Sequence, residues 1–451
     1  ILDKALIAEA ARMYATADGA SIPWTPITDQ QISSTSAIRL HSILRAVTGN
    51  LDVVGGDTLG GFNPSYIPES ELGLHEVLSP EQKAKQMGYD DHPVYTYRVA
   101  EMLKEPTEKV WGFPYADIVM GCHMANPTNV FRAMKTEQPY PIKAFIVLGN
   151  NALLSYPNQH QILEAMMNQE LIVAHELFMT PTAMLADYIL PGDVFTERNH
   201  VADSWSWTTR LTLSQKVVEP PEQASSTYQF WHDLAVRFGF GNEFPWQSIE
   251  EVLDHRLARS GRTFREFEEQ GFMEMPIPEY RKYRKTGFAT PSGKVELYSS
   301  ILEELGFDPL PYYREGPATS PEYPYMVFTG VREDPFFQTG QRNVKELRDR
   351  CPVPSVFIHP EDATRDGLND GDWISLETAH GKVSAQLSVQ SSMKQGHLRV
   401  PHGWWYPEMR GQESLAGAFL SSDAVLCSDD DEFLDYEQGI PHFKGFPGKV
   451  V

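Results

Sequence analysis

The sequence has few cysteines, no long apolar run and a shortage of positive charge, and each of these excludes a class of protein. Its three cysteines, Cys122, Cys351 and Cys427, are an odd number and form no Cys-x-x-Cys pair. Neither a disulfide framework nor a zinc site is therefore indicated, and we assign no metal ligand. The longest apolar stretch, near residues 144–148, is far shorter than the roughly 20 residues that cross a bilayer, so we expect no direct membrane span.

Basic residues are outnumbered, because 38 Lys and Arg stand against 61 Asp and Glu, which leaves a formal charge of −23. A field of that sign repels polyanions, so we expect no nucleic-acid partner. The remaining composition, with 41% apolar and 22% charged residues, is that of an ordinary globular chain. A length of 451 residues suggests about two to four domains.

The first residues already follow an amphipathic helical pattern, Leu2–Tyr14, without an initiator Met, a basic n-region or a twin-Arg signal. We therefore expect a piece of a longer chain. The compartment, cytoplasmic or periplasmic, stays open because a targeting signal could lie upstream.

The pattern over residues 143–192 predicts parallel strands. Residues 144–148 form an apolar run typical of a strand buried on both faces, and residues 159–167 have helical spacing. Residues 171–174 form a second such run, and 187–190 a third short strand. This is a β-turn-α-β unit extended by one strand.

Polar residues stand where the first two of these strands end. Gly149, Asn150 and Asn151 follow the first strand, and Glu176 follows the second. Open α/β sheets bind ligands at this edge, where backbone N–H groups can face a phosphate and a carboxylate can accept from a ribose or a guanine. The alternative is a structural turn, with Glu176 capping the segment that follows.

The middle of the chain is less regular. Residues 62–91 have no clear period, residues 226–238 predict a helix, and the charged stretch 249–269 predicts another. The Pro- and Gly-rich stretch 308–324 predicts a domain boundary. Six acids within residues 428–437 predict a solvated surface segment.

Beyond that boundary the pattern is rich in strands, and two polar segments follow strand ends. Residues 329–343 combine glycines with Arg332, Arg342 and other donors, which suits an anionic ligand, although a polar surface loop has the same composition. Trp404 and Trp405 pack an interface or a core edge more often than they stack on a cofactor. Strands separated by turns, with one short helix at 360–366, predict a compact barrel with strands at 325–329, 355–359, 373–378, 382–389 and 397–400.

Taken together, these segments resemble the molybdopterin oxidoreductases, the dimethyl sulfoxide reductase-like enzymes that hold molybdenum or tungsten between two pterin guanine dinucleotides. The resemblance extends in order and spacing over nearly the whole chain. It is carried by residues 44–56, 143–151, 178–191 with Glu197, 329–332, 360–363, 367–372, Gly381, 402–405 and 441–444.

The resemblance implies the fold class, which is Rossmann-like α/β with a parallel sheet, followed by a C-terminal double-psi β-barrel. Residues 1–57 would end the third domain, 58–205 belong to the second, 206–320 supply connecting and first-domain elements, and 321–451 form the barrel. The implied cofactor is bis-molybdopterin guanine dinucleotide with Mo or W. The residues implied to bind it are Gly149, Asn150, Asn151, Glu176, Thr180, Thr329, Gly330, Arg332, Thr339, Gln341, Arg342, His402, Trp404 and Lys444.

The family also implies parts that this chain lacks. A [4Fe-4S] cluster and the protein ligand of the metal belong upstream of residue 1, so the chain alone is not a complete catalyst. Two positions depart from the family pattern, because Glu176 stands where Asp is usual and Asp423 or Ala424 where Asn is expected.

The implied reaction is oxygen-atom or hydroxyl transfer coupled to electron transfer on a small-molecule substrate, with an iron–sulfur electron-transfer subunit as partner. Arg332 is the candidate catalytic residue, as an electrostatic stabiliser of the reacting group. Two alternatives stay open. One is a redox-neutral hydratase or transhydroxylase of the same family, and the other is a non-catalytic pterin-binding fragment.

Overall fold

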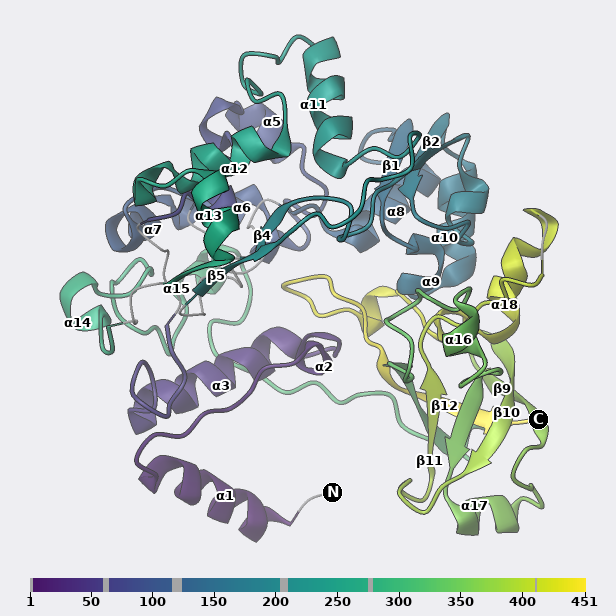
Figure 1. The fold of residues 1–451 in the computed structure, drawn as a ribbon. Coiled ribbons are helices and arrows are strands. Elements are labelled where there is room, and N and C mark those ends of the chain that lie inside the picture. Colours follow the sequence, from purple (N-terminus) through teal and green to yellow (C-terminus); the bar gives the residue numbers. More distant parts are fainter. Residues whose placement is uncertain (1–2, 60–64, 116–123, 203–209, 275–278, 410–411) are drawn as a thin grey trace. The chain divides into compact units, whose positions relative to one another are not determined.

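A computed structural model describes residues 3–59, 65–115, 124–202, 210–274, 279–409 and 412–451 (Figure 1). The chain forms two compact units, each assembled from separate stretches of sequence. The first, called the helical unit below, comprises residues 1–28, 35–126 and 193–313. The second, the barrel unit, comprises residues 29–34, 127–192 and 314–451. The division into four segments at residues 57, 205 and 320 stays a prediction.

Helices dominate the helical unit, and side-chain caps fix where several of them begin. Asp3 accepts a hydrogen bond from the backbone N–H of Ala5, and Ser226 accepts one from Gln229, which satisfies donors that the first turn of a helix leaves unpaired. The helices predicted near residues 2–14, 36–47 and 226–238 are confirmed as α1, α3 and α11. The unit contains α1 (Lys4–Thr16), α2 (Pro26–Asp29), α3 (Ser34–Thr48), α4 (Glu69–Leu72), α5 (Pro80–Ala84), α6 (Tyr97–Met102), α7 (Lys104–Trp111), α11 (Thr227–Arg237), α12 (Ile249–Leu257), α13 (Phe264–Gln270), α14 (Tyr283–Thr286) and α15 (Ser300–Glu304).

The single long helix predicted over residues 249–269 is wrong, because the structure has two helices there. Gly261 adopts a positive φ of 71° after α12 and a short 3-10 turn, a conformation that ends helices. Thr263 and Glu266 then form a reciprocal capping box that starts α13. Both signals are local, and the charge pattern across the break concealed them.

An antiparallel sheet that the sequence did not predict packs with these two helices. Its strands are β4 (His200–Ala202), β5 (Arg210–Ser214) and β6 (Phe272–Glu274), in that order. Leu211 from the central strand and Phe267 from α13 are fully buried in the shared core. Strands β4 and β6 have three residues each and β5 has five, and strands this short carry little alternation by which to recognise them in a sequence.

The parallel sheet of the barrel unit confirms the predicted β-turn-α-β unit. Its strands β1 (Ala144–Leu148), β2 (Leu171–Glu176) and β3 (Tyr188–Pro191) lie in that order and are all parallel. Helix α10 (Gln159–Met167) connects the first two, as predicted. Helix α8 (Pro127–Thr136) and the short α9 (Ala152–Ser155) complete this region. All three strands therefore end at the same edge of the sheet, and their polar ends are brought together.

The C-terminal part forms a closed six-stranded barrel, which confirms the predicted fold class (Figure 1). Around the barrel the strand order is β10-β8-β11-β7-β12-β9. Strand β7 is parallel to its neighbour β11 and antiparallel to its other neighbour β12. The elements are β7 (Tyr325–Val331), α16 (Lys345–Arg348), β8 (Ser355–Ile358), α17 (Pro360–Arg365), β9 (Trp373–Thr378), β10 (Lys382–Val389), β11 (His397–Pro401), α18 (Ala418–Ser421) and β12 (Lys444–Val450).

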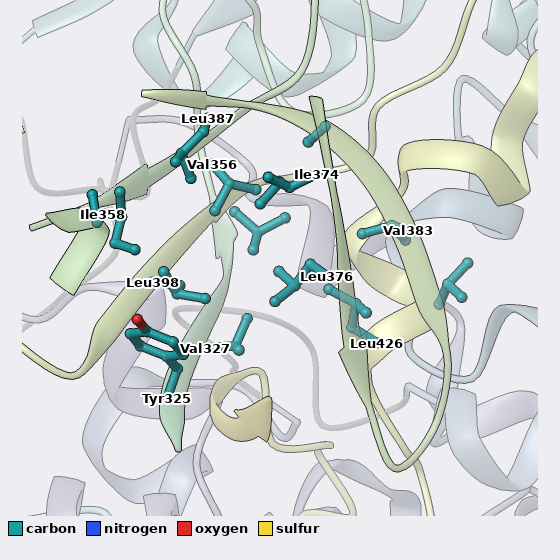
Figure 2. Close-up of a cluster of buried hydrophobic side chains, with 14 residues drawn as sticks. Tyr325, Val327, Val356, Ile358, Ile374, Leu376, Val383, Leu387, Leu398 and Leu426 are labelled. Atoms are coloured by element: carbon teal, nitrogen blue, oxygen red, sulfur yellow. The ribbon is translucent and has the colours of Figure 1, made fainter. Parts of the chain in front are cut away.

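Apolar side chains from the strands fill the barrel, as Figure 2 shows. Val356, Leu376 and Leu398 come from three different strands and are each 0% exposed. Along β8, β9 and most of β10, buried residues alternate with more exposed ones, which is the period-2 pattern that made these strands predictable.

Two features of this unit differ from the predictions. Strand β12 was missed because Gly445, Pro447 and Gly448 interrupt its pattern, although it closes the barrel against β7 and β9. The acidic run is solvated only in part, since Asp430, Asp431 and Glu432 are exposed whereas Asp429, Asp435 and Glu437 are buried. Asp429, for example, accepts a hydrogen bond from Asn158 Nδ2 at 2.7 Å, and such partners make burial of a carboxylate tolerable.

Among the described residues, no helix has both the length and the apolar character needed to cross a membrane. Cys122, one of the three cysteines, lies outside the described residues.

Candidate functional site

The turn after β1 is the first group of predicted site residues. Gly149 and Asn150 are exposed, and Gly149 has a positive φ of 54°. Its backbone N–H donates to the carbonyl of His175 at 3.0 Å, which ties the turn to the end of β2. A Cβ placed on Gly149 would meet nothing within 4 Å, so the turn faces open space.

Asn151 holds this turn in place through hydrogen bonds. Its Oδ1 accepts from the hydroxyl of Thr182 at 2.7 Å, and that hydroxyl oxygen accepts from the N–H of Leu153 at 3.0 Å. The Nδ2 amide of Asn151 is buried and has no hydrogen-bond partner in the described part of the chain. An unsatisfied buried donor costs about 1–3 kcal/mol, so this amide is suited to a ligand that supplies an acceptor.

Glu176 and Thr180 stand at the end of the neighbouring strand. Burial raises the pKa of Glu176, while its Oε1 accepts from the N–H of Leu177 at 2.8 Å. Thr180 is buried, and its hydroxyl oxygen accepts from the N–H of Ala183. The structural alternative for Glu176 is therefore supported by backbone donors at Leu177 and Phe178.

The second group of predicted residues lies at one rim of the barrel. Gly330, near the end of β7, has a positive φ of 65°, and a Cβ there would lie 2.5 Å from Lys444 Nζ. Lys444, at the start of β12, donates to the carbonyls of Thr329 and Gly330, each at 2.9 Å. Burial lowers the pKa of Lys444. The chain thus places a partly buried ammonium against the backbone of β7, where only glycine leaves room for it.

Asp423 connects this rim to the residues that follow β11. Its Oδ2 accepts from the N–H of Gly330 at 2.6 Å, and its Oδ1 accepts from the N–H of Gly403 at 2.8 Å. His402 Nδ1 lies 3.1–3.2 Å from the two oxygens. We call Thr329, Gly330, His402, Gly403, Asp423 and Lys444 the rim cluster.

The loop between β7 and β8 holds the next predicted residues. Arg342 is 1% exposed and donates to the carbonyl of His402 at 2.7 Å and to that of Gln338 at 2.8 Å. Burial lowers its pKa to about 10. The carbonyl of Thr339 accepts from Trp405 Nε1 at 2.7 Å. Arg342 and Thr339 thus connect this loop to the segment after β11.

Trp404 is fully buried rather than open to solvent. The guanidinium carbons of Arg342 and Arg348 lie 5.1 and 4.7 Å from the centre of its ring. Its Nε1 and the Nε of Arg342 have no hydrogen-bond partner in the described ranges.

Two predicted residues stand apart from the rim cluster. Arg332 is exposed, with its guanidinium 5.6 Å from the ring centre of Phe337 and its carbonyl accepting from Arg399 at 2.9 Å. Gln341 is exposed with a positive φ of 66° and accepts from the N–H of Phe337 at 3.3 Å. The structure gives neither side chain a contact with His402, Asp423 or Lys444.

One apolar cluster connects the two groups of site residues. Trp405, directly after His402-Gly403-Trp404, packs in the same core as Ala152 and Leu153, which directly follow Asn151. The turn after β1 and the segment after β11 are therefore supported by shared packing within the barrel unit.

Sequence reasoning did not assign a role to Asp423 or Thr182, although both hold predicted residues in place. Asp423 was noted only as a departure from an expected Asn. Its partners are 93 residues upstream at Gly330 and 20 residues upstream at Gly403, so no local pattern connects them.

The parallel sheet, the barrel and these two loop groups define a class of protein, namely the enzymes that hold a pterin dinucleotide. The family model "Molybdopterin oxidoreductase" matches residues 71–237, and "Molydopterin dinucleotide binding domain" matches residues 326–430. The chain belongs to the molybdopterin oxidoreductase family, as the resemblance implied.

The relatives include acetylene hydratase from Syntrophotalea acetylenica, which is 44% identical over 98% of this chain and 62% of that protein. The thiosulfate reductase molybdopterin-containing subunit from Salmonella typhimurium is 27% identical over 61% of this chain and 40% of that protein. The structure of acetylene hydratase from Pelobacter acetylenicus matches with a TM-score of 0.94 and 43% identity, over 100% of this chain and 63% of that one. The chain thus spans about two fifths to three fifths of the length of these relatives.

The described residues fit a dinucleotide. Buried donors without partners occur in both loop groups, at Asn151 Nδ2, Arg342 Nε and Trp404 Nε1. The turn at Gly149 leaves open space beside it. A ligand rich in phosphate and carbonyl oxygens supplies the acceptors that these donors lack.

Proposed function

We propose that this chain is the C-terminal part of an enzyme that holds bis-molybdopterin guanine dinucleotide with Mo or W and adds water across an unsaturated bond of a small substrate. The observation that carries the hydratase assignment is the 44% identity to acetylene hydratase over 98% of the chain. The TM-score of 0.94 to a solved acetylene hydratase supports it. This was the alternative in the sequence analysis, and the comparisons favour it over oxygen-atom transfer.

The chain's own contribution is to bind and orient the cofactor. The backbone of Gly149 and Asn150 and the amide of Asn151 offer hydrogen bonds to phosphate, while Glu176 and Thr180 are positioned to hold a guanine nucleoside. Lys444, Arg342 and His402 place donors at the barrel rim, which is how a net negative chain can bind an anionic ligand locally. When bound, the cofactor supplies a Lewis-acidic, redox-active metal on pterin dithiolenes.

Arg332 keeps its proposed role as an electrostatic stabiliser of the reacting group. Its side chain is exposed and makes no ion pair in the described part of the chain, so it is available to a ligand. If it serves the reaction, Arg332→Lys lowers turnover and leaves cofactor content unchanged. If it is a cofactor ligand instead, the same substitution lowers metal and nucleotide content.

The second candidate is oxygen-atom or hydroxyl transfer coupled to electron transfer, with an iron–sulfur subunit as partner. It is favoured by 26% identity to dopamine dehydroxylase from Eggerthella lenta over 82% of this chain and 27% to the thiosulfate reductase subunit. The expected [4Fe-4S] cluster and metal ligand lie upstream of residue 1 under either candidate. A non-catalytic pterin-binding fragment is the third possibility.

The deciding experiment uses the native full-length protein, analysed for mass and for Mo, W and Fe. Acetylene and water are then supplied without any external electron donor or acceptor. Acetaldehyde formation, which balances as C2H2 + H2O → C2H4O, supports the hydratase. Turnover that requires an electron donor or acceptor supports the second candidate, and a metal-free 51.0 kDa protein supports the third.

A further inference from the structure

Asp423 is a carboxylate with no exposure to solvent, and it joins the ends of two parallel strands. It accepts backbone hydrogen bonds from Gly330 at the end of β7 and from Gly403 after β11, at 2.6 and 2.8 Å. Complete burial opposes its ionisation. His402 and the two N–H groups outweigh this effect and hold the pKa of Asp423 below its usual range. The carboxylate is therefore ionised and can only accept hydrogen bonds.

The ionised carboxylate of Asp423 determines which nitrogen of the neighbouring His402 imidazole carries a hydrogen. Since His402 Nδ1 lies 3.1–3.2 Å from both oxygens of an ionised carboxylate, Nδ1 must carry the hydrogen. The other ring nitrogen, Nε2, makes no hydrogen bond to any described residue. Carboxylate–imidazole pairs of this kind orient a histidine whose second nitrogen meets a ligand.

The groups around the pair favour an acceptor-rich or anionic ligand. Lys444 approaches from β12, Arg342 from the loop between β7 and β8, and the Cys427 thiol from the same segment as Asp423. Burial raises the pKa of Cys427, so the thiol stays neutral. Two cations, Lys444 and Arg342, thus interact with the carboxylate of Asp423, while the buried Glu333 adds a second acidic group beside Arg342.

We propose that Asp423 is a positioning residue that holds His402 with Nδ1 protonated, so that Nε2 is the atom presented to the pterin dinucleotide. This rests on the proposed cofactor binding. An asparagine, which the family pattern led us to expect at residue 423 or 424, has one acceptor oxygen, whereas the N–H groups of Gly330 and Gly403 each need an acceptor. The NH2 group of an asparagine at residue 423 would therefore face a backbone N–H donor, and the hydrogen bonds that hold Asp423 and His402 together could not all form.

The test uses the full-length holoenzyme with Asp423→Asn, His402→Asn and the control Asp362→Asn. Asp362 is also buried in the barrel unit and accepts from the N–H of Gly396 at 2.6 Å and from Arg365 at 2.7 Å, away from the rim cluster. Each variant is measured for metal and for guanine nucleotide released on denaturation, and for its thermal unfolding midpoint. Asp423→Asn is expected to weaken cofactor retention by about 10–100-fold, the usual effect of losing a group that orients a ligand residue. Asp362→Asn lowers the unfolding midpoint and leaves cofactor content unchanged.

His402→Asn separates positioning from simple scaffolding. The asparagine amide reaches the position of Nδ1 and can still donate to Asp423, but it has no counterpart of Nε2. Loss of cofactor supports the proposal if the unfolding midpoint of the variant equals that of wild-type protein from which the cofactor has been removed. Wild-type cofactor content in either His402→Asn or Asp423→Asn overturns it, and His402→Asn decides alone if Asp423→Asn does not fold. Wild-type enzyme without guanine nucleotide would instead overturn the proposed function and this inference together.

Discussion

The interior of the barrel and its rim are built from the same strands with opposite side-chain chemistry. Inside, Val356, Leu376 and their neighbours are apolar and fully buried. At the rim, Asp423 and His402 are also buried, at 0% and 8% exposure, but they are polar or charged. Apolar burial stabilises a fold without regard to direction, whereas a buried polar group is tolerated only if specific partners satisfy it. The interior therefore stabilises the fold. The buried polar groups of the rim reduce that stability but fix a defined arrangement of hydrogen-bond donors.

Among the variants that test this comparison, Leu376→Ala in the barrel interior is expected to cause the largest loss of folding stability. Leu376 is 0% exposed on β9, and truncating such a residue costs about 2–5 kcal/mol because a cavity remains. Hydrogen exchange of the barrel strands measures the loss. A loss no greater than that of an exposed-site variant would contradict the assignment of stability to the interior.

Glu333→Gln tests a polar group near the rim, with an effect that depends on pH. Burial raises the pKa of Glu333 from 4.5 to about 7, so between these values the folded state keeps a proton that the unfolded state loses. Stability therefore falls as pH rises through this window. The neutral glutamine avoids the penalty, which corresponds to about 3 kcal/mol above pH 7 from 1.36 kcal/mol per pKa unit.

Unfolding curves of wild type and Glu333→Gln at pH 4 and pH 8 measure this difference. Equal stability at pH 4 and a more stable variant at pH 8 are expected. A difference that does not change with pH would show that the carboxyl group ionises normally.

Gly403→Ala tests whether the rim needs its backbone conformation. Gly403 has a positive φ of 56°, and a Cβ there would lie 2.3 Å from Thr339 Cγ2. Strain of about 1–3 kcal/mol is expected, together with lower cofactor content because Thr339 and Asp423 must shift. Measuring unfolding and bound nucleotide in parallel separates the two effects, and unchanged nucleotide content would contradict the role given to the rim.

Lys345→Ala is the smallest change and serves as the surface reference. Its ion pair with Asp349, the residue that follows α16, is exposed at both side chains, and such pairs contribute little to stability. We expect no measurable change in the unfolding midpoint or in cofactor content. A clear loss of either would mean that this helix supports the site.

The difference between apolar patterns and contacts distant in sequence also explains which elements the sequence predicted. The barrel strands and the β-turn-α-β unit were found because their apolar periods are local, as at residues 144–148 and 373–378. Strand β12 and the sheet β4-β5-β6 were missed because glycine, proline or short length removes that period.

The site was predicted in part for a related reason. Gly149, Gly330 and His402 follow strands, and the family resemblance located them. The bond between Asp423 and Gly330 spans 93 residues and depends on barrel closure, so no window of sequence contains it. The burial of Asp429 was missed likewise, since its partner Asn158 lies 271 residues away.

The position of β12 near the end of the described chain determines when the barrel can close during synthesis. Strand β12 is the last barrel strand to leave the ribosome, and it carries Lys444 into contact with Thr329 and Gly330. Until it pairs with β7 and β9, the barrel has two open edges and its rim lacks an ammonium group. Closure of the barrel and its rim therefore follows translation of residues 444–450, and a nascent chain halted before residue 444 exposes unpaired strands to aggregation.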